Sequence, residues 1–179
     1  MDIYKLNWTR LQAGIFSLLC LRAGEKLSQR EIAKILNVSP TAVANSLKFL
    51  KKENMVEIEK TKTINFISFN RNEKRVIELK RVENLRNVYV SGLLDYLETA
   101  LAGATIILFG SYALGEDSKN SDIDIAVIGR KDKLLNLGEY EKILNRSINV
   151  NFYDSWGKIH KDLKNNILNG ILLEGNIEL

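Results

Sequence analysis

The chain has few of the residues that build covalent or metal-bound frameworks, since its 179 residues include one cysteine, one histidine and one proline. Cys20 lies in an apolar run, so we expect a buried thiol and no disulfide or cysteine metal cluster. His160 has no cysteine or histidine near it, and we expect it at the surface. Apolar runs of about 20 residues, as a membrane span needs, are missing, and so is a secretory signal pattern. These absences predict a cytoplasmic protein.

Charge is distributed unevenly along the chain. Residues 1–100 contain 17 Lys and Arg against 11 Asp and Glu, a net charge of +6, whereas residues 101–179 contain 9 against 11, a net charge of −2; together they give +4. A basic excess favours polyanionic partners. The N-terminal part is therefore where we expect such a partner to bind.

The first 70 residues follow the order helix, short helix, turn, helix, hairpin. Apolar residues at helical spacing predict a helix over about 8–22, and Ser28 and Ser39 each have the pattern of a helix N-cap. Extended runs at 56–59 and 64–69 flank a short basic segment, as the strands of a hairpin would.

This order resembles a winged helix-turn-helix domain covering residues 1–70. By that resemblance, the third helix would lie in the major groove of double-stranded DNA and the hairpin would form a wing that meets phosphate or the minor groove. The candidate DNA-contacting residues are Thr41, Asn45, Lys48, Lys51, Lys60 and Lys62. The alternative is a winged helix that contacts only proteins and whose lysines are a solvated face.

Residues 71–93 continue a helical pattern that reaches about Leu101, with a charged first half and an apolar second half. We interpret them as a linker helix that leaves the first domain and packs on the following one. The charged half would either pair with a second subunit in a homodimer or be a plain solvated helix.

Two carboxylates stand out in the second half of the chain. An apolar run at 105–109 indicates a buried strand that ends at Gly110-Ser111, and strand alternation in 122–127 places Asp122 and Asp124 on one face. Adjacent carboxylates repel each other, so a cation between them is expected. Hard oxygen ligands on a rigid strand suit Mg²⁺ that carries the phosphates of a nucleotide.

The motif Gly110-Ser111, a spacer ending in Ser121, and Asp122-Ile123-Asp124 resembles the signature of polymerase beta-type nucleotidyltransferases, most closely the minimal nucleotidyltransferases, over residues 94–179. The resemblance implies that Asp122 and Asp124 are catalytic and hold Mg²⁺. It assigns a nucleoside triphosphate to Gly110, Ser111, Gly115 and Ser121. The alternative is a surface turn followed by an amphipathic strand. The predicted fold class is α+β: a winged helix, a linker helix and a small α/β domain with a mixed sheet.

A third strand is predicted at 148–153. In active members of the family, this strand carries another carboxylate, which completes the metal site and accepts the proton of the attacking hydroxyl. Matching Val150-Asn151-Phe152 to that pattern places Asn151 at the position. An amide has no negative charge and cannot act as a general base near neutral pH.

Three functions follow as hypotheses. The first is a DNA-binding transcriptional regulator whose second domain binds Mg-nucleotide without turnover. The second is an active nucleotidyltransferase that moves a nucleoside monophosphate to a protein or another hydroxyl acceptor, as antitoxin members of the family do. The third is a simple repressor whose second domain is a vestigial dimerisation scaffold.

Overall fold

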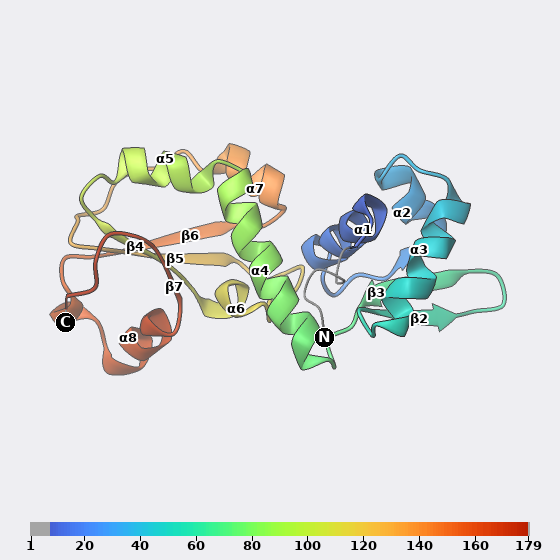
Figure 1. Cartoon of the computed structure of the whole chain (residues 1–179). Coiled ribbons are helices and arrows are strands. Elements are labelled where there is room, and N and C mark those ends of the chain that lie inside the picture. Colours follow the sequence, from blue (N-terminus) through green and yellow to red (C-terminus); the bar gives the residue numbers. More distant parts are fainter. Residues whose placement is uncertain (1–7, 179) are drawn as a thin grey trace. The chain divides into compact units, whose positions relative to one another are not determined.

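The computed structural model describes residues 8–178, and the chain divides into two compact units, Met1–Val76 and Ile77–Leu179 (Figure 1). The unit boundary lies close to the predicted end of the first domain. Residues 1–7 and 179 of the predicted domains lie outside the described residues. Within residues 8–178, no helix combines the length and the apolar character that crossing a membrane requires.

The N-terminal unit has the predicted order of elements. It consists of α1 (Arg10–Leu21), β1 (Leu27–Ser28), α2 (Gln29–Ile35), α3 (Pro40–Lys52), β2 (Val56–Lys60) and β3 (Asn65–Phe69). The strands form an antiparallel sheet in the order β1-β3-β2. Strand β1 is the one element absent from the sequence prediction, because two residues are too few to show alternation.

Side-chain caps explain where the helices of this unit begin. Ser28 and Glu31 form a capping box at α2, and the hydrogen bonds from Ser28 lower the pKa of the Glu31 carboxyl. The Ser39 hydroxyl accepts from the Ala42 amide at 3.1 Å, and Pro40 occupies the first position of α3, where a missing N–H is harmless. Both helix starts were predicted correctly.

The C-terminal unit is built on a mixed four-stranded sheet, as predicted. Its elements are α4 (Lys74–Val90, which begins before the boundary), α5 (Leu93–Ala100), β4 (Thr105–Phe109), α6 (Gly110–Leu114), β5 (Ile123–Ile128), α7 (Gly138–Leu144), β6 (Ile148–Tyr153), the 3₁₀ turn η2 (Trp156–Lys158), α8 (Lys161–Leu168) and β7 (Ile171–Glu174). The strand order is β6-β5-β4-β7, with β5 and β6 parallel and the other pairs antiparallel.

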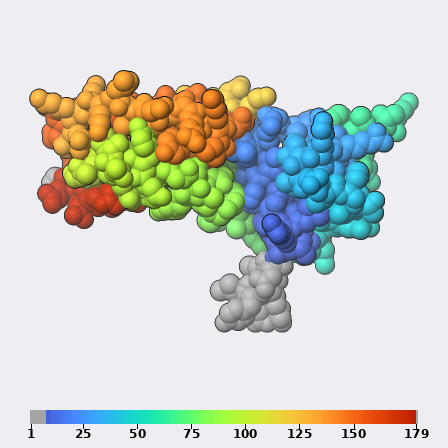
Figure 2. Space-filling view, turned by 90° about the horizontal axis from the view of Figure 1, so that it is seen from above, coloured from blue at the N-terminus to red at the C-terminus, as the bar shows by residue number. Residues whose placement is uncertain are grey.

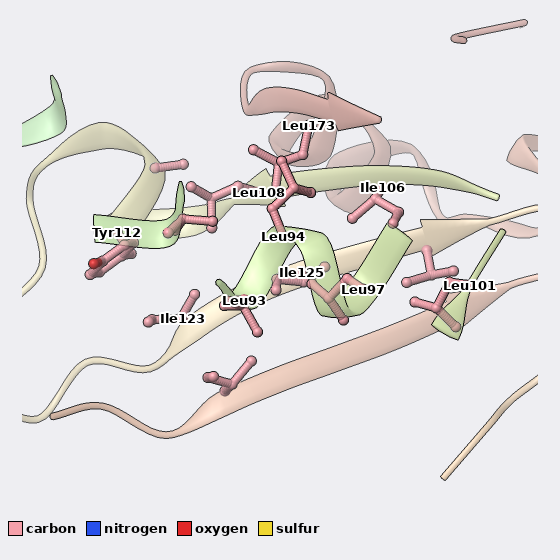
Figure 3. Close-up of a cluster of buried hydrophobic side chains, with 14 of the residues drawn as sticks. Leu93, Leu94, Leu97, Leu101, Ile106, Leu108, Tyr112, Ile123, Ile125 and Leu173 are labelled. Atoms are coloured by element: carbon pink, nitrogen blue, oxygen red, sulfur yellow. The ribbon is translucent and has the colours of Figure 1, made fainter. Parts of the chain in front are cut away.

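Strand alternation gives the sheet two different faces. Ile123, Ile125 and Val127 belong to a large core with α5 (Figure 3), whereas Ala126 and Ile128 belong to a smaller core with η2 and α8. Helices α5 and α7 cover the first face and α8 lies on the second (Figure 1). Asp124 alternates with the isoleucines and so shares the face of Ala126.

The predicted continuous helix over 71–101 is two helices. Gly92 has a φ of 77°, in the left-handed region, so α4 ends at Val90 and α5 begins at Leu93. Within the C-terminal unit, α4 buries Lys80, Asn84 and Val88, which lie on one face at intervals of four residues. The linker helix therefore packs on the second domain through a face that is partly polar.

Candidate functional site

Asp122 directly precedes β5, and Asp124 is the second residue of that strand. Asp124 pairs in register with Phe109, the last residue of β4, so the carboxylates are next to the turn into α6. Asp124 is half-buried. This burial raises the pKa of its carboxyl; the hydrogen bond from Asn149 acts in the opposite direction, and the charge of Asp122 raises it further. The site thus disfavours two free anions, as the sequence suggested.

The amide beside these carboxylates is that of Asn149 and not that of Asn151. In the parallel pair of β5 and β6, Asp124 is opposite Asn149, whereas Asn151 is opposite Ala126. The Asn149 side-chain nitrogen donates to Asp122 Oδ2 at 3.0 Å. The assignment of Asn151 to the third-carboxylate position stays a prediction, and the register and this hydrogen bond make Asn149 a second candidate for it. The sequence of β6 is compatible with either asparagine at this position, because Asn149 and Asn151 alternate along the strand and lie on the same face.

Gly110 has a backbone conformation that favours glycine, and it lies close to the Asp124 carboxylate. It has a φ of 73°, and a Cβ at this position would lie 2.6 Å from Asp124 Oδ2. A side chain at position 110 would therefore collide with the carboxylate unless Asp124 shifted. Ser111 follows in the first turn of α6, where it is partly exposed.

We expect Gly110→Ala to lower the free energy of unfolding more than an alanine substitution at another glycine that has a similar φ but no neighbour at its Cβ position. The left-handed conformation costs about 1–2 kcal/mol for an alanine, and the carboxylate contact adds to it. Gly103→Ala is the matched control, because Gly103 has a φ of 83° and nothing lies within 4 Å of its Cβ position. Urea unfolding measures both; equal losses would contradict the role of the contact.

The other two residues assigned to the nucleotide have structural contacts of their own. Gly115 ends α6 with a φ of 76°, and its Cβ would lie 2.5 Å from the Ile77 carbonyl oxygen and 2.8 Å from the Arg81 nitrogen. Gly115 thus permits close packing of α6 against α4. The Ser121 hydroxyl accepts from the Ser118 amide at 3.0 Å and closes the turn before Asp122.

The donor set fits a nucleotide-bound Mg²⁺. Two carboxylates and an amide supply hard oxygen donors, and Mg²⁺ usually takes one or two carboxylates and completes its shell with phosphates and water. Among residues 8–178, no group of three or more His, Cys, Asp or Glu side chains is arranged to hold a metal ion.

A pocket of about 470 Å³ opens beside Asp122. Lys119, Lys142 and Arg146 contribute cationic groups to its wall, and Glu141 contributes a carboxylate. A larger pocket, of about 660 Å³, lies around Thr105, Trp156 and Gly175 and contains none of the predicted site residues. Of the predicted site residues, Ser121 and Asp122 line the smaller pocket, whereas Gly110, Ser111 and Asp124 do not.

All six candidate DNA-contacting residues are exposed in the N-terminal unit. Thr41, Asn45 and Lys48 share one face of α3, and Lys48 Nζ donates to Asn45 Oδ1 at 3.2 Å. Lys51 lies in the last turn of α3, and Lys60 and Lys62 lie at the tip of the β2–β3 hairpin. Figure 2 shows this tip projecting from the unit.

Comparison with known proteins identifies a separate family for each part. The nucleotidyltransferase domain matches residues 90–173, and the gntR family of bacterial regulatory proteins matches residues 17–65. A curated protein of Methanocaldococcus jannaschii, named "Putative protein adenylyltransferase", is 43% identical over 67 residues, which are 35% of this chain and 69% of that protein.

Similarity to solved structures is weaker. ZitR of Lactococcus lactis is 18% identical with a TM-score of 0.41, over 56% of this chain and 64% of ZitR, so the chain spans less than two thirds of that protein. AdcR of Streptococcus pyogenes is 17% identical with a TM-score of 0.42, over 57% of this chain and 72% of AdcR. The family matches and the M. jannaschii relative decide the assignment: the chain belongs to the nucleotidyltransferase family and carries a winged helix-turn-helix domain ahead of its nucleotidyltransferase domain.

Proposed function

We propose that the protein is a DNA-binding transcriptional regulator whose C-terminal domain binds a Mg-nucleoside triphosphate without turning it over. The observation that supports this proposal is Asn149 beside Asp122 and Asp124. Asp122 and Asp124 can hold a metal ion, whereas an asparagine at the third-carboxylate position cannot act as a general base. The ligand would then serve as a signal that changes DNA affinity.

In this proposal Asp122 and Asp124 hold Mg²⁺, which supplies positive charge to the phosphates. Gly110 allows the phosphates to approach the backbone, and Ser111 offers a hydroxyl. Asn149 orients Asp122 by donating to it, but its amide cannot take a proton from an attacking hydroxyl near neutral pH. Binding and catalysis thus depend on different residues of one site.

A second function is favoured by the M. jannaschii relative, whose name refers to protein adenylylation. In that case the protein would transfer a nucleoside monophosphate to a protein acceptor, and another group would replace the missing carboxylate. Release of pyrophosphate that depends on Asp124 distinguishes this function from a sensor.

We expect a Mg-nucleotide to raise the Tm of the wild type but not of Asp122→Ala, with no pyrophosphate released. At a hundred times its dissociation constant, a ligand stabilises the fold by about 2.7 kcal/mol. A thermal shift with each of the four ribonucleoside triphosphates measures this. Asp154→Ala is the matched control, because Asp154 is an exposed carboxylate at the end of β6 that pairs with Lys158. No shift with any nucleotide would favour the vestigial scaffold.

DNA binding is proposed through the exposed face of α3 and the wing. We expect Lys48→Ala and Lys60→Ala each to weaken DNA binding to a similar extent whatever the DNA sequence. If each lysine contacts one phosphate, each variant should also lower the slope of log K against log salt concentration by about 1. Glu57→Ala, also on the hairpin, should not weaken it. Binding titrations at several salt concentrations measure these slopes. Unchanged slopes for both lysines would contradict the assignment.

Nucleotide and DNA must influence each other equally if the domains are coupled. A nucleotide that changes DNA affinity by some factor requires DNA to change nucleotide affinity by the same factor. Titrating each ligand in the presence of the other tests this equality. DNA affinity that is the same with and without Mg-nucleotide would rule out a sensor.

A homodimer is proposed through the exposed face of α4, where Val82 is 65% exposed and Tyr89 is 49% exposed. In an antiparallel pair of α4 helices centred on Val82, Glu78 would face Arg86 of the second copy, because both lie four residues from the centre. Arg86 also forms an ion pair with Glu83 of its own helix at 2.7 Å, so in the dimer it would lie between two carboxylates. Sedimentation gives the mass, and a monomer at all concentrations would contradict the pairing.

A further inference from the structure

Asp117 is a buried carboxylate outside the signature residues of the site. Its side chain is 1% exposed, and that of Lys80, which forms an ion pair with Asp117 Oδ1, is 0% exposed. Asn84 Nδ2 donates to the same oxygen at 2.7 Å, and an Arg146 terminal nitrogen donates to Asp117 Oδ2 at 3.3 Å. Buried charges are costly even when they are paired, and apolar residues of similar volume are often as stabilising, so this cluster is a candidate for a role besides stability.

Each partner of Asp117 leads to a segment of the candidate site. Asn84 also donates to the Tyr112 carbonyl oxygen at 2.9 Å, in α6 directly after Ser111. Asp117 itself lies in the loop that runs from the end of α6 to Asp122. Arg146 lies in the wall of the pocket beside Asp122 and three residues before Asn149. One carboxylate therefore joins the α6 turn, the loop before β5 and the start of β6.

Helix α4 supplies a second, independent contact to the same region. Its backbone at Ile77 and Arg81 packs on Gly115 so closely that a Cβ there would lie under 3 Å from both. Lys80 and Asn84 follow on the same helix. The segment between α6 and β5 is thus fixed to α4 at Gly115 by packing and at Asp117 by charge.

We propose that Asp117 is a positioning residue, which sets the spacing between Ser111, Asp122 and Asn149 by fixing their segments to α4 through Lys80, Asn84 and Arg146. The proposal rests on the proposed nucleotide binding at this site. Asp117 does not contact the ligand in it. A consequence is that the site holds its shape only while α4 is in place.

The test compares Asp117→Asn with Leu101→Ala in the full-length protein. Leu101 is 1% exposed and directly follows α5, in the same unit, and it has no polar side-chain group that could bond to the three segments. Both variants lose stability. Mg-ATP affinity is measured calorimetrically, well below the lower Tm, and amide hydrogen exchange is measured without nucleotide. Asn84→Ala, which removes one donor without removing a charge, is the second variant if Asp117→Asn does not fold.

We expect Asp117→Asn to bind Mg-ATP about 10- to 100-fold more weakly than the wild type, because small displacements in a site have effects of this size. Leu101→Ala should stay within about twofold, as distant sites do. Exchange should increase in residues 111–122 and 146–149 of Asp117→Asn, and not in the middle of β4. Equal affinities in the two variants, or a uniform increase in exchange, would overturn the positioning role.

Failure of the proposed function gives a different result. If the wild type binds no Mg-nucleotide, the nucleotide proposal fails, and the exchange experiment still decides whether Asp117 orders these segments. Faster exchange confined to them supports positioning, and uniform exchange contradicts it.

Discussion

Asn149→Asp is expected to give the protein a nucleotidyl transfer activity that the wild type lacks. The new carboxylate would lie opposite Asp124 and next to Asp122, where the register of β5 and β6 places residue 149. A positioned general base accelerates proton transfer by about 10²–10⁴-fold. Pyrophosphate release, together with the mass of any modified acceptor or of the protein itself, measures the gain.

Asn151→Asp is the matched control for this gain. It makes the same chemical change on the same strand and face, but opposite Ala126. We expect no activity from it, because the carboxylate would be two residues away from the metal position. Activity in Asn151→Asp and not in Asn149→Asp would contradict the site as described here, and activity in the wild type would contradict the sensor.

The same substitution also has a consequence for stability. A third carboxylate adds repulsion to a pair in which burial and Asp122 already raise the pKa of Asp124. Asn149→Asp should therefore have a lower Tm than the wild type in a chelator, and Mg²⁺ should restore more of it. An identical response to Mg²⁺ in both proteins would indicate that the metal binds elsewhere.

Asp117→Leu is expected to lower the free energy of unfolding by about 3–5 kcal/mol, because it takes the carboxylate away from two buried cationic groups, those of Lys80 and Arg146. Denaturant unfolding measures the loss. Asp154→Leu is the comparison, since Asp154 and Lys158 form an exposed ion pair and such pairs contribute little to stability.

A second variant separates lost charge pairing from lost packing. In Asp117→Leu the buried Lys80 ammonium has lost the Asp117 carboxylate. Adding Lys80→Met replaces this cation with an apolar side chain of similar volume, so the double variant should recover part of the lost free energy of unfolding. If the double variant is less stable than Asp117→Leu alone, the ion pair is not the source of the stability, and packing around α4 is.

Local signals were enough to predict the N-terminal unit. Caps at Ser28 and Ser39 and the alternation of β2 and β3 act within a few residues, so the sequence displays them directly. The positions of the second sheet's strands also follow from short apolar runs. Such runs do not specify the register in which neighbouring strands pair, because a shift of two residues keeps every side chain on the same face of the sheet.

That gap explains why the sequence alone does not separate Asn149 from Asn151 as the third-carboxylate position. Asn149 and Asn151 are equivalent in periodicity, and only pairing with Asp124 distinguishes them. The buried ion cluster was missed for a related reason. Lys80 and Asp117 lie 37 positions apart, and a lysine in a charged helix is expected to be solvated. One signal was present: Lys80 shares a four-residue spacing with Asn84 and Val88, which marks the buried face of α4.

Pairing of β7 with β4 has a consequence for the order in which the protein can fold during synthesis. Ile107 and Leu108 of β4 pair in register with Leu172 and Ile171 of β7, more than 60 positions later. Until those residues have left the ribosome, one edge of an almost wholly apolar strand has no neighbour, and such an edge invites pairing with other chains. The N-terminal unit has no such dependence, because its last strand ends at Phe69. A nascent chain would thus have a complete winged helix well before its second sheet is closed.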